Sequence, residues 1–166
     1  SVQGRSKAAK PYFLEVYKIR VSQKDSIGLG YVLLDLAEIA LQEGNIKKCL
    51  QYTDESTLIR KNIGDNYGVT VNLVFKGEMY FKAGYYEEAI KFLKRGFDES
   101  IQIGYPDLTS QAAELISRVY KTMGNYEEAL GFHQQHDVIR DSLLSKENAQ
   151  VIRDLQTKYE TRSEEH

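Results

Sequence analysis

Apolar, small and aromatic residues recur along the chain in three matched segments, at 36–50, 76–90 and 116–130. Each segment is centred on a glycine, and these glycines, Gly44, Gly84 and Gly124, follow one another at intervals of 40 residues. Helical periodicity precedes each glycine and resumes after it. Glycine suits the left-handed residue that ends a helix, so the pattern predicts a repeated pair of helices joined by a tight turn.

Small side chains occur where the two helices of each predicted pair must approach closely. They lie seven residues before the glycine and five residues after it, at Ala37, Gly77, Ser117, Cys49, Ala89 and Ala129. Large rings lie four residues before it and two after it, where they can fill the wedge between helices, at Tyr80, Tyr120, Tyr86 and Tyr126. Asn45 and Asn125 follow the glycine and can cap the next helix.

The same pattern predicts the layout of the whole chain. We expect a leading helix over about 11–24, helix pairs over about 27–62, 67–102 and 107–142, and a last helix over about 143–162. The last helix carries a short heptad-like stripe with one polar position, formed by Leu144, Asn148, Val151, Leu155 and Tyr159. Two interpretations stay open for it: a helix folded back on the last pair, or the seam of a homodimer.

Composition and charge narrow the class of protein. The chain is 42% hydrophobic and 28% charged, as is normal for a folded domain. Its net charge is −2, so there is no overall positive charge to attract nucleic acid. Cys49 is the single cysteine, which excludes an internal disulfide and a zinc site built on several thiolates. The apolar runs are only a few residues long, far short of the roughly 20 that a membrane-spanning helix needs.

Few residues suggest chemistry. His133 and His136 lie three residues apart beside Asp137, a spacing that can present two imidazoles on one face. His133 takes the place of Leu93 one repeat earlier, however, so we assign it to the wall of the helix pair. Cys49 takes a small core position and is expected to pack rather than react. We therefore predict no catalytic residue, no metal site and no cofactor, and a chain that is not an enzyme.

The repeated unit resembles the tetratricopeptide repeat. Gly77, Tyr80, Gly84, Tyr86 and Ala89 match the family's pattern best, the third unit matches at four positions, and the first is degenerate. The family's unit has 34 residues, so each helix here is about three residues longer. The resemblance implies an all-α fold, a right-handed helical solenoid over residues 1–142, followed by a linker or coiled-coil-like helix over 143–166.

The resemblance also implies where a partner binds. In the family, the first helix of each pair lines a concave groove that takes a protein or peptide. The matching positions here are Tyr31, Leu34, Glu38, Leu41, Val71, Val74, Glu78, Phe81, Gln111, Glu114, Arg118 and Lys121.

The end of the chain resembles a narrower group. The segments 140–143 and 155–160 are similar to those of bacterial sensor proteins, mostly of Bacteroidetes, in which repeats of this length lead into a transmembrane helix and then a histidine kinase or a helix-turn-helix DNA-binding domain. That resemblance implies the non-catalytic, periplasmic sensor region of a membrane-anchored signalling protein, with no nucleic-acid contact in this chain. The alternative is a cytoplasmic scaffold or adaptor of the same fold.

Overall fold

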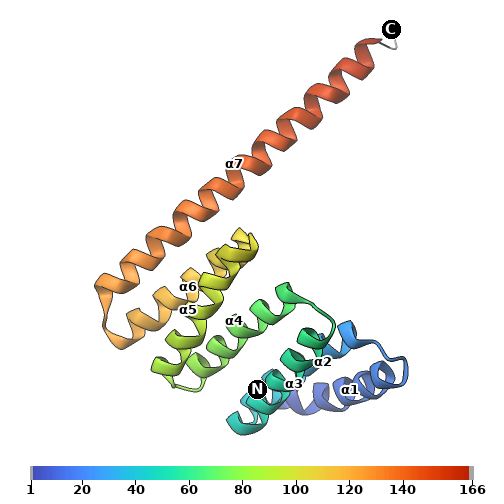
Figure 1. The fold of residues 1–166 in the computed structure, drawn as a ribbon, viewed down its shortest axis with the longest axis vertical. Helices are drawn as coiled ribbons and strands as arrows, with labels where there is room; N and C mark the ends of the chain where they lie inside the picture. The colour runs from blue at the N-terminus through green and yellow to red at the C-terminus, as the bar shows by residue number, and fades with distance from the viewer. Residues whose placement is uncertain (1, 165–166) are drawn as a thin grey trace.

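The computed structural model describes residues 2–164, which form an array of antiparallel helices that extends at one end into a single long helix (Figure 1). No strand occurs in that range. The helices are α1 (Val2–Ser22), α2 (Ser26–Gln42), α3 (Ile46–Asn62), α4 (Asn66–Lys82), α5 (Tyr86–Ile103), α6 (Pro106–Met123) and α7 (Tyr126–Glu164). The predicted all-α repeat solenoid is confirmed.

The turns explain why the helices alternate in direction. Gly44, Gly84 and Gly124 adopt φ angles of 79°, 86° and 82°, the left-handed conformation that costs glycine least. Gly64 and Gly104 do the same between one pair and the next, with φ of 72° and 76°. The predicted cap at Asn45 is confirmed, because its side-chain oxygen accepts a hydrogen bond from the Lys48 N–H at 3.0 Å.

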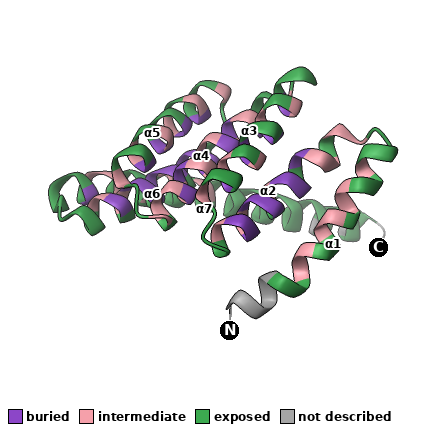
Figure 2. Cartoon of the chain, turned by 90° about the horizontal axis from the view of Figure 1, so that it is seen from below, coloured by how far each residue is buried: buried purple, intermediate pink, exposed green. Residues whose placement is uncertain are grey.

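The core lies between successive helices, and Figure 2 shows the buried residues concentrated along α2, α4 and α6. Around α4, α5 and α6 it consists of Val74, Ala89, Leu93, Leu108, Ala112, Leu115, Ile116 and Val119. The small positions of the repeat are buried as predicted at Ala37, Gly77, Cys49, Ala89 and Ala129. Ser117 is half-buried, and its hydroxyl donates a hydrogen bond of 2.7 Å to the Ala129 carbonyl oxygen on the facing helix.

Two boundaries differ from the prediction. α1 begins at Val2 rather than near residue 11, with Pro11 inside it. More important, α7 continues without a break from Tyr126 to Glu164, so no turn separates a last helix at 142–143. The first two pairs end on Gly64 and Gly104, whereas the third carries Leu144 at the equivalent position. Leucine does not favour the left-handed conformation that ends a helix, so the helix continues.

The extension of α7 does not fold back on the array, and Figure 1 shows it running away from the other helices. Leu144, Val151 and Leu155 are 48%, 55% and 61% exposed. The interpretation of a folded-back helix is therefore wrong. The side chain of Tyr159, the last member of the predicted stripe, lies outside the described residues.

Cys49 is fully buried, and burial, with a smaller contribution from Glu38, raises the pKa of its thiol to about 11. At pH 8 this lowers the thiolate fraction about 100-fold relative to a thiol with a pKa of 9. We expect Ellman's reagent to react with the native protein extremely slowly, and rapidly once urea unfolds it. A native protein that is labelled as fast as the unfolded one would contradict the packing role, and Cys49→Ala is the unlabelled control.

The same shift has a consequence for stability. A raised pKa in the folded state means that the folded protein favours the neutral thiol. The contribution of the neutral thiol to the free energy of unfolding is therefore complete below pH 9. We expect that contribution to be lost as the pH rises from about 9 to about 11. Urea unfolding of the wild type and of Cys49→Ala across this interval measures it.

Candidate functional site

The predicted concave residues lie on α2, α4 and α6, and several are neighbours in space. Lys82 Nζ lies 3.2 Å from Glu38 Oε1 and 3.6 Å from Glu78 Oε1, so it links the first two pairs. The Arg118 guanidinium lies 5.8 Å from the centre of the Phe81 ring, which links the second and third pairs. This part of the predicted surface is therefore a continuous band of mixed charge.

Other members of that set do not form an open groove. Val74 is 1% exposed within the core, so its assignment to a ligand-binding surface is wrong. Its position is fixed by α5, because a Cβ on Gly96 would lie 2.7 Å from Val74 Cγ2. Tyr31 is exposed, but its ring packs under the Arg60 guanidinium at 4.6 Å. Binding of a partner by the remaining residues stays a prediction.

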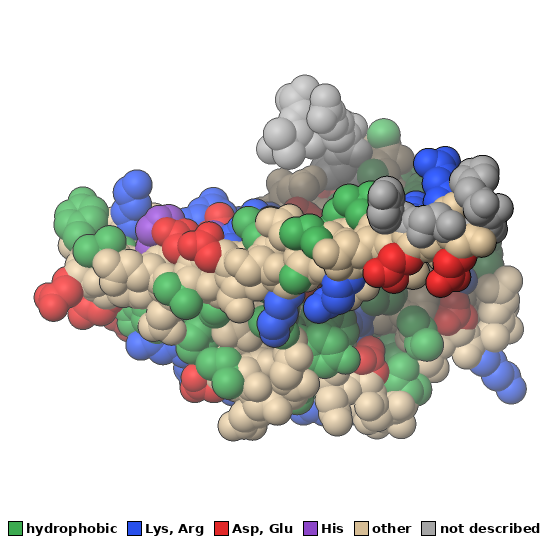
Figure 3. All heavy atoms as spheres, turned by 90° about the horizontal axis from the view of Figure 1, so that it is seen from above, with side chains coloured by type: hydrophobic (Ala, Val, Ile, Leu, Met, Phe, Trp, Pro, Cys, Tyr) green, Lys and Arg blue, Asp and Glu red, His purple; other side chains and the backbone are tan. Residues whose placement is uncertain are grey.

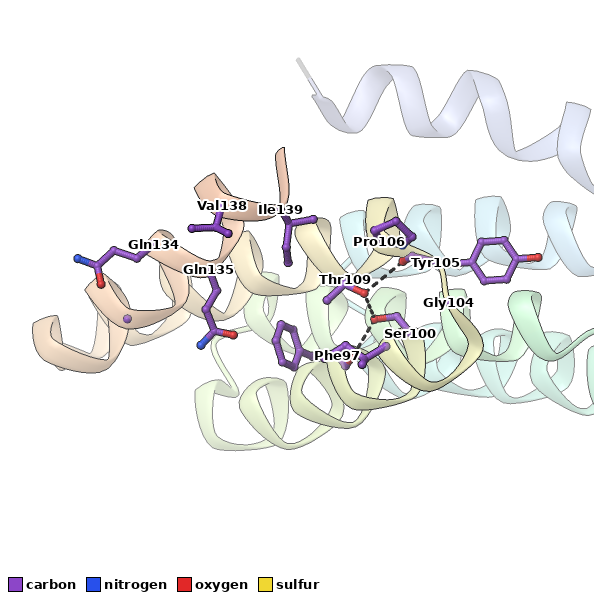
Figure 4. Close-up of a pocket in the computed structure, with 12 residues that line it drawn as sticks. Phe97, Ser100, Gly104, Tyr105, Pro106, Thr109, Gln134, Gln135, Val138 and Ile139 are labelled. Atoms are coloured by element: carbon purple, nitrogen blue, oxygen red, sulfur yellow. Dashed lines mark hydrogen bonds between the residues drawn. The ribbon is translucent and has the colours of Figure 1, made fainter. Parts of the chain in front are cut away.

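The structure has a second hollow that the sequence reading missed, and we call it the α5–α7 groove. It has a volume of about 720 Å³ and lies between α5, the start of α6 and α7, with Gln135 and Ile139 projecting into it from α7 near Phe97 (Figure 4). Its lining residues are Phe97, Ser100, Ile101, Gly104, Tyr105, Pro106, Thr109, Gly131, Gln134, Gln135, Val138 and Ile139.

The chemistry of the α5–α7 groove is apolar. None of the lining residues carries a charge. The two hydroxyls at its floor satisfy each other, because Ser100 Oγ and Thr109 Oγ1 are 2.7 Å apart. Ser100 Oγ also lies 2.7 Å from the Phe97 carbonyl oxygen, and Thr109 Oγ1 lies 3.2 Å from the Tyr105 carbonyl oxygen. The floor therefore offers little hydrogen bonding to a ligand, and the remaining polar side chains of the lining are those of Tyr105, Gln134 and Gln135.

Comparison with the preceding repeat shows that the repeat architecture does not impose this character. Counting back 40 residues gives the equivalent positions between α3, α4 and α5, eight of which are charged. They are Thr57, Arg60, Lys61, Gly64, Asp65, Asn66, Val69, Lys91, Lys94, Arg95, Asp98 and Glu99. Lys61 becomes Ile101, Asp98 becomes Val138 and Glu99 becomes Ile139. This difference between aligned repeats is the signal by which the sequence could have revealed the groove.

An exposed cluster of apolar side chains indicates a surface that something covers. In this chain the positions where apolar residues replace charged ones lie together in the α5–α7 groove. Ile101 is 56% exposed and Val138 is 69% exposed. In the preceding repeat, charged side chains meet water at these two positions. The α5–α7 groove is therefore the candidate functional site of the chain.

Comparison with known proteins agrees with this fold. A tetratricopeptide-repeat family model matches residues 72–99, which cover most of α4 and α5. The crystal structure of BtubC (BKLC) from P. vanneervenii superposes with a TM-score of 0.71 at 17% sequence identity, over 86% of this chain and 59% of that one. At this identity the likeness concerns the fold, and the chain spans 59% of the length of that protein. No curated protein matches the sequence significantly.

Residues 72–99 thus match a tetratricopeptide repeat within an all-α helical array, and such repeats generally mediate protein–protein interactions. Among the described residues, no helix is long and apolar enough to cross a membrane.

Proposed function

We propose that this chain is a non-catalytic interaction module that docks an amphipathic helix of a partner protein in the α5–α7 groove. The observation that carries the proposal is the uncharged lining of that groove, set against eight charges at the equivalent positions one repeat earlier. A charged or strongly polar ligand would lose its hydration there without compensation. The partner surface must therefore be apolar and uncharged.

The hydrogen bonding of the groove favours a helix over an extended peptide. An extended segment needs partners for its backbone N–H and C=O groups when it is buried. The Ser100 and Thr109 hydroxyls are already engaged, so the floor supplies few. A helix satisfies its own backbone and can present apolar side chains at intervals of three, four and seven residues to a trough between α5 and α7.

A displayed library of amphipathic helical peptides provides the probe for this function. Selection on the immobilised chain should enrich peptides with an uncharged apolar stripe at helical spacing. Failure to enrich any sequence, or enrichment of peptides that are charged throughout, would contradict the proposal. A parallel selection with non-helical peptides of the same composition separates helix recognition from general hydrophobic adhesion.

The exposed stripe on the α7 extension supports a second contact, between two copies of the chain. Leu144, Val151 and Leu155 recur at heptad-like spacing with Asn148 among them, a pattern typical of a helix-pairing seam. Leu144 lies six positions after Val138, which rotates its direction by about 240° around the helix axis, so the stripe and the groove lie on different faces. Pairing of the extensions leaves the α5–α7 groove open.

Removal of residues 143–166 is expected to convert a dimer into a monomer, because it deletes the stripe and leaves the three helix pairs. Sedimentation velocity of the full chain and of the shortened chain measures this. Val151→Lys with Leu155→Lys in the full chain is the companion variant, since both side chains are exposed and the fold does not depend on them. A full chain that is monomeric at about 100 μM, or a shortened chain that stays dimeric, would contradict the seam.

The setting that we propose is the sensor region of a bacterial signalling protein, exported and membrane-anchored, with a histidine kinase or a helix-turn-helix output domain in the parent protein. The resemblance of residues 140–143 and 155–160 to such sensors supports it. So does the unbroken 39-residue helix α7, which reaches from the groove wall into the extension and could carry a change in packing along its length. The alternative is a cytoplasmic scaffold with the same docking mode.

The full-length gene decides between these settings. The sensor proposal requires a hydrophobic span of roughly 20 residues and an output domain encoded beyond His166. A gene that encodes neither would favour the scaffold, and docking in the α5–α7 groove would be unaffected by that outcome.

A further inference from the structure

Two histidines and two carboxylates lie close together in the last helix pair. His133, His136 and Asp137 belong to α7, and Glu114 belongs to α6. His133 Nε2 lies 3.3 Å from Asp137 Oδ2, and His136 Nδ1 lies 3.2 Å from Asp137 Oδ1. One ligand atom from each of these residues lies within 4.8 Å of the others. Figure 3 shows histidine beside acidic side chains at the molecular surface. The sequence shows the two histidines beside Asp137, for which we predicted no metal site, and the structure adds Glu114.

These separations suit a transition-metal ion. Ligand atoms at 2.0–2.2 Å from a tetrahedral centre are roughly 3.3–3.5 Å apart. Both histidine nitrogens already lie at about that separation from an Asp137 oxygen, and rotation of the exposed His133 and Asp137 side chains can bring the three ligand atoms around one ion. His133 and Asp137 have side chains that are 56% and 55% exposed, so an ion can reach them from solvent and keep water as a further ligand.

The fourth group has the place of an orienting partner. Glu114 Oε2 on α6 lies 3.7 Å from His136 Nε2, the ring nitrogen that would not bind the ion. Metal-binding histidines usually donate this second N–H to a carboxylate, which fixes the tautomer and the ring direction. His136 and Glu114 line a polar hollow of about 270 Å³ between α6 and α7, which allows the ring and the carboxylate to draw closer.

The position of the cluster in the repeat also sets it apart. One repeat earlier the equivalent residues are Leu93, Gly96 and Phe97; Leu93 and Gly96 are buried, and Phe97 is half-buried. In the last pair, polar metal-binding side chains replace all three. A polar outer face suits the end of a solenoid, but solubility alone does not require two imidazoles around one carboxylate.

We propose that His133, His136 and Asp137 bind a divalent transition-metal ion of the zinc type, with Glu114 positioning His136. Imidazole and carboxylate ligands suit zinc and its neighbours rather than magnesium or calcium, which take oxygen ligands. With three protein ligands, the ion would keep a site for water or for a group from a partner. Such an ion would tie α6 to α7 through the Glu114–His136 contact.

Isothermal titration of the tag-free chain with Zn²⁺ tests the site, with Mg²⁺ as the comparison ion. We expect one Zn²⁺ per chain and no response to Mg²⁺. His133→Ala and His136→Ala should each weaken Zn²⁺ binding at least about 10-fold, and Glu114→Gln about 10-fold or more. His166→Ala is the matched control, because it removes the third histidine of the chain, and it should leave binding unchanged.

Histidine nitrogen NMR of the same samples supplies a second readout, since Zn²⁺ should shift His136 Nδ1 while Nε2 keeps its proton. The absence of saturable binding up to about 1 mM Zn²⁺ would overturn the proposal, as would binding that survives His133→Ala with His136→Ala. Loss of binding in His166→Ala would overturn the assigned ligand set. Wild-type affinity in Glu114→Gln would overturn the positioning role. Thermal unfolding of each variant checks that the fold is intact.

Discussion

Replacing Gly77 with alanine is expected to lower the free energy of unfolding by about 1–2 kcal/mol, although alanine is the better helix former by about 1 kcal/mol. The reason is the contact between α4 and α5. A Cβ at position 77 would lie 2.6 Å from Leu93 Cγ and 3.1 Å from the Leu93 backbone nitrogen. The backbone atom cannot move without displacing α5, so the strain exceeds the gain in helix propensity.

A double-mutant cycle with Leu93→Ala identifies the cause. Leu93 is fully buried, so its truncation alone should cost about 2–5 kcal/mol. With Leu93 shortened, the added methyl group no longer meets Leu93 Cγ and Cδ2 and keeps only the contact with the backbone nitrogen. The two effects should therefore be coupled by about 1 kcal/mol or more. The first pair shows the same compensation, because Ala37 stands in place of Gly77 and the smaller Thr53 in place of Leu93.

Gly131→Ala is the matched control for this prediction. It lies within helix α7, and nothing lies within 4 Å of a Cβ built there. It should therefore raise the free energy of unfolding by roughly 0.5–1 kcal/mol. Urea unfolding of the four cycle variants and this control gives all values. Stabilisation by Gly77→Ala as large as that by Gly131→Ala would show that the helices do not approach as closely as described.

Placing the charges of the preceding repeat in the α5–α7 groove should abolish docking. Ile101→Lys and Val138→Asp together copy Lys61 and Asp98, which occupy the equivalent positions one repeat earlier. A bound helix would then bury two charges beside apolar side chains. We expect a selected helical peptide to bind at least about 100-fold more weakly, which corresponds to about 2.8 kcal/mol.

The variant is designed to keep the fold intact. Both side chains are more than half exposed in the free chain, so their replacement should change the melting temperature little. Leu58→Asp is the control, because it removes a 60% exposed leucine on α3 at the position equivalent to Asp98. Calorimetric titration of the peptide into the three proteins gives the affinities. Equal weakening by Leu58→Asp would point to general hydrophobic adhesion instead of a site.

The sequence predicts most of the fold because the repeat encodes it locally. The glycines at 44, 84 and 124 determine where each hairpin turns, and the small residues determine where its helices touch. The error in α7 concerns a residue that breaks the pattern, since Leu144 stands where Gly64 and Gly104 end the earlier pairs. The continuous helix is therefore predictable from the comparison of repeats, because the turn glycine is missing at position 144.

The candidate sites were less predictable, because each draws on helices from different parts of the chain. The α5–α7 groove combines residues of three helices, and its apolar character emerges only when Ile101 and Val138 are compared with their charged counterparts. Glu114 reaches His136 from another helix, a contact that spacing along the chain does not reveal. Val74 is buried against α5 at Gly96, whereas the equivalent Leu34 is half-buried and Glu114 is exposed, so the repeat pattern alone does not predict its burial.

The most direct test of the central claim is an amide NMR titration of the chain with a selected helical peptide. If the partner docks in the α5–α7 groove, the largest shift changes should cluster at its lining residues, such as Ile101, Gly104, Gly131 and Val138. The amide shifts of Glu38, Glu78 and Arg118, in the band of mixed charge on the predicted concave surface, should remain unchanged. Changes concentrated on that concave band, with the groove unaffected, would contradict the account and restore the surface that the family resemblance implied.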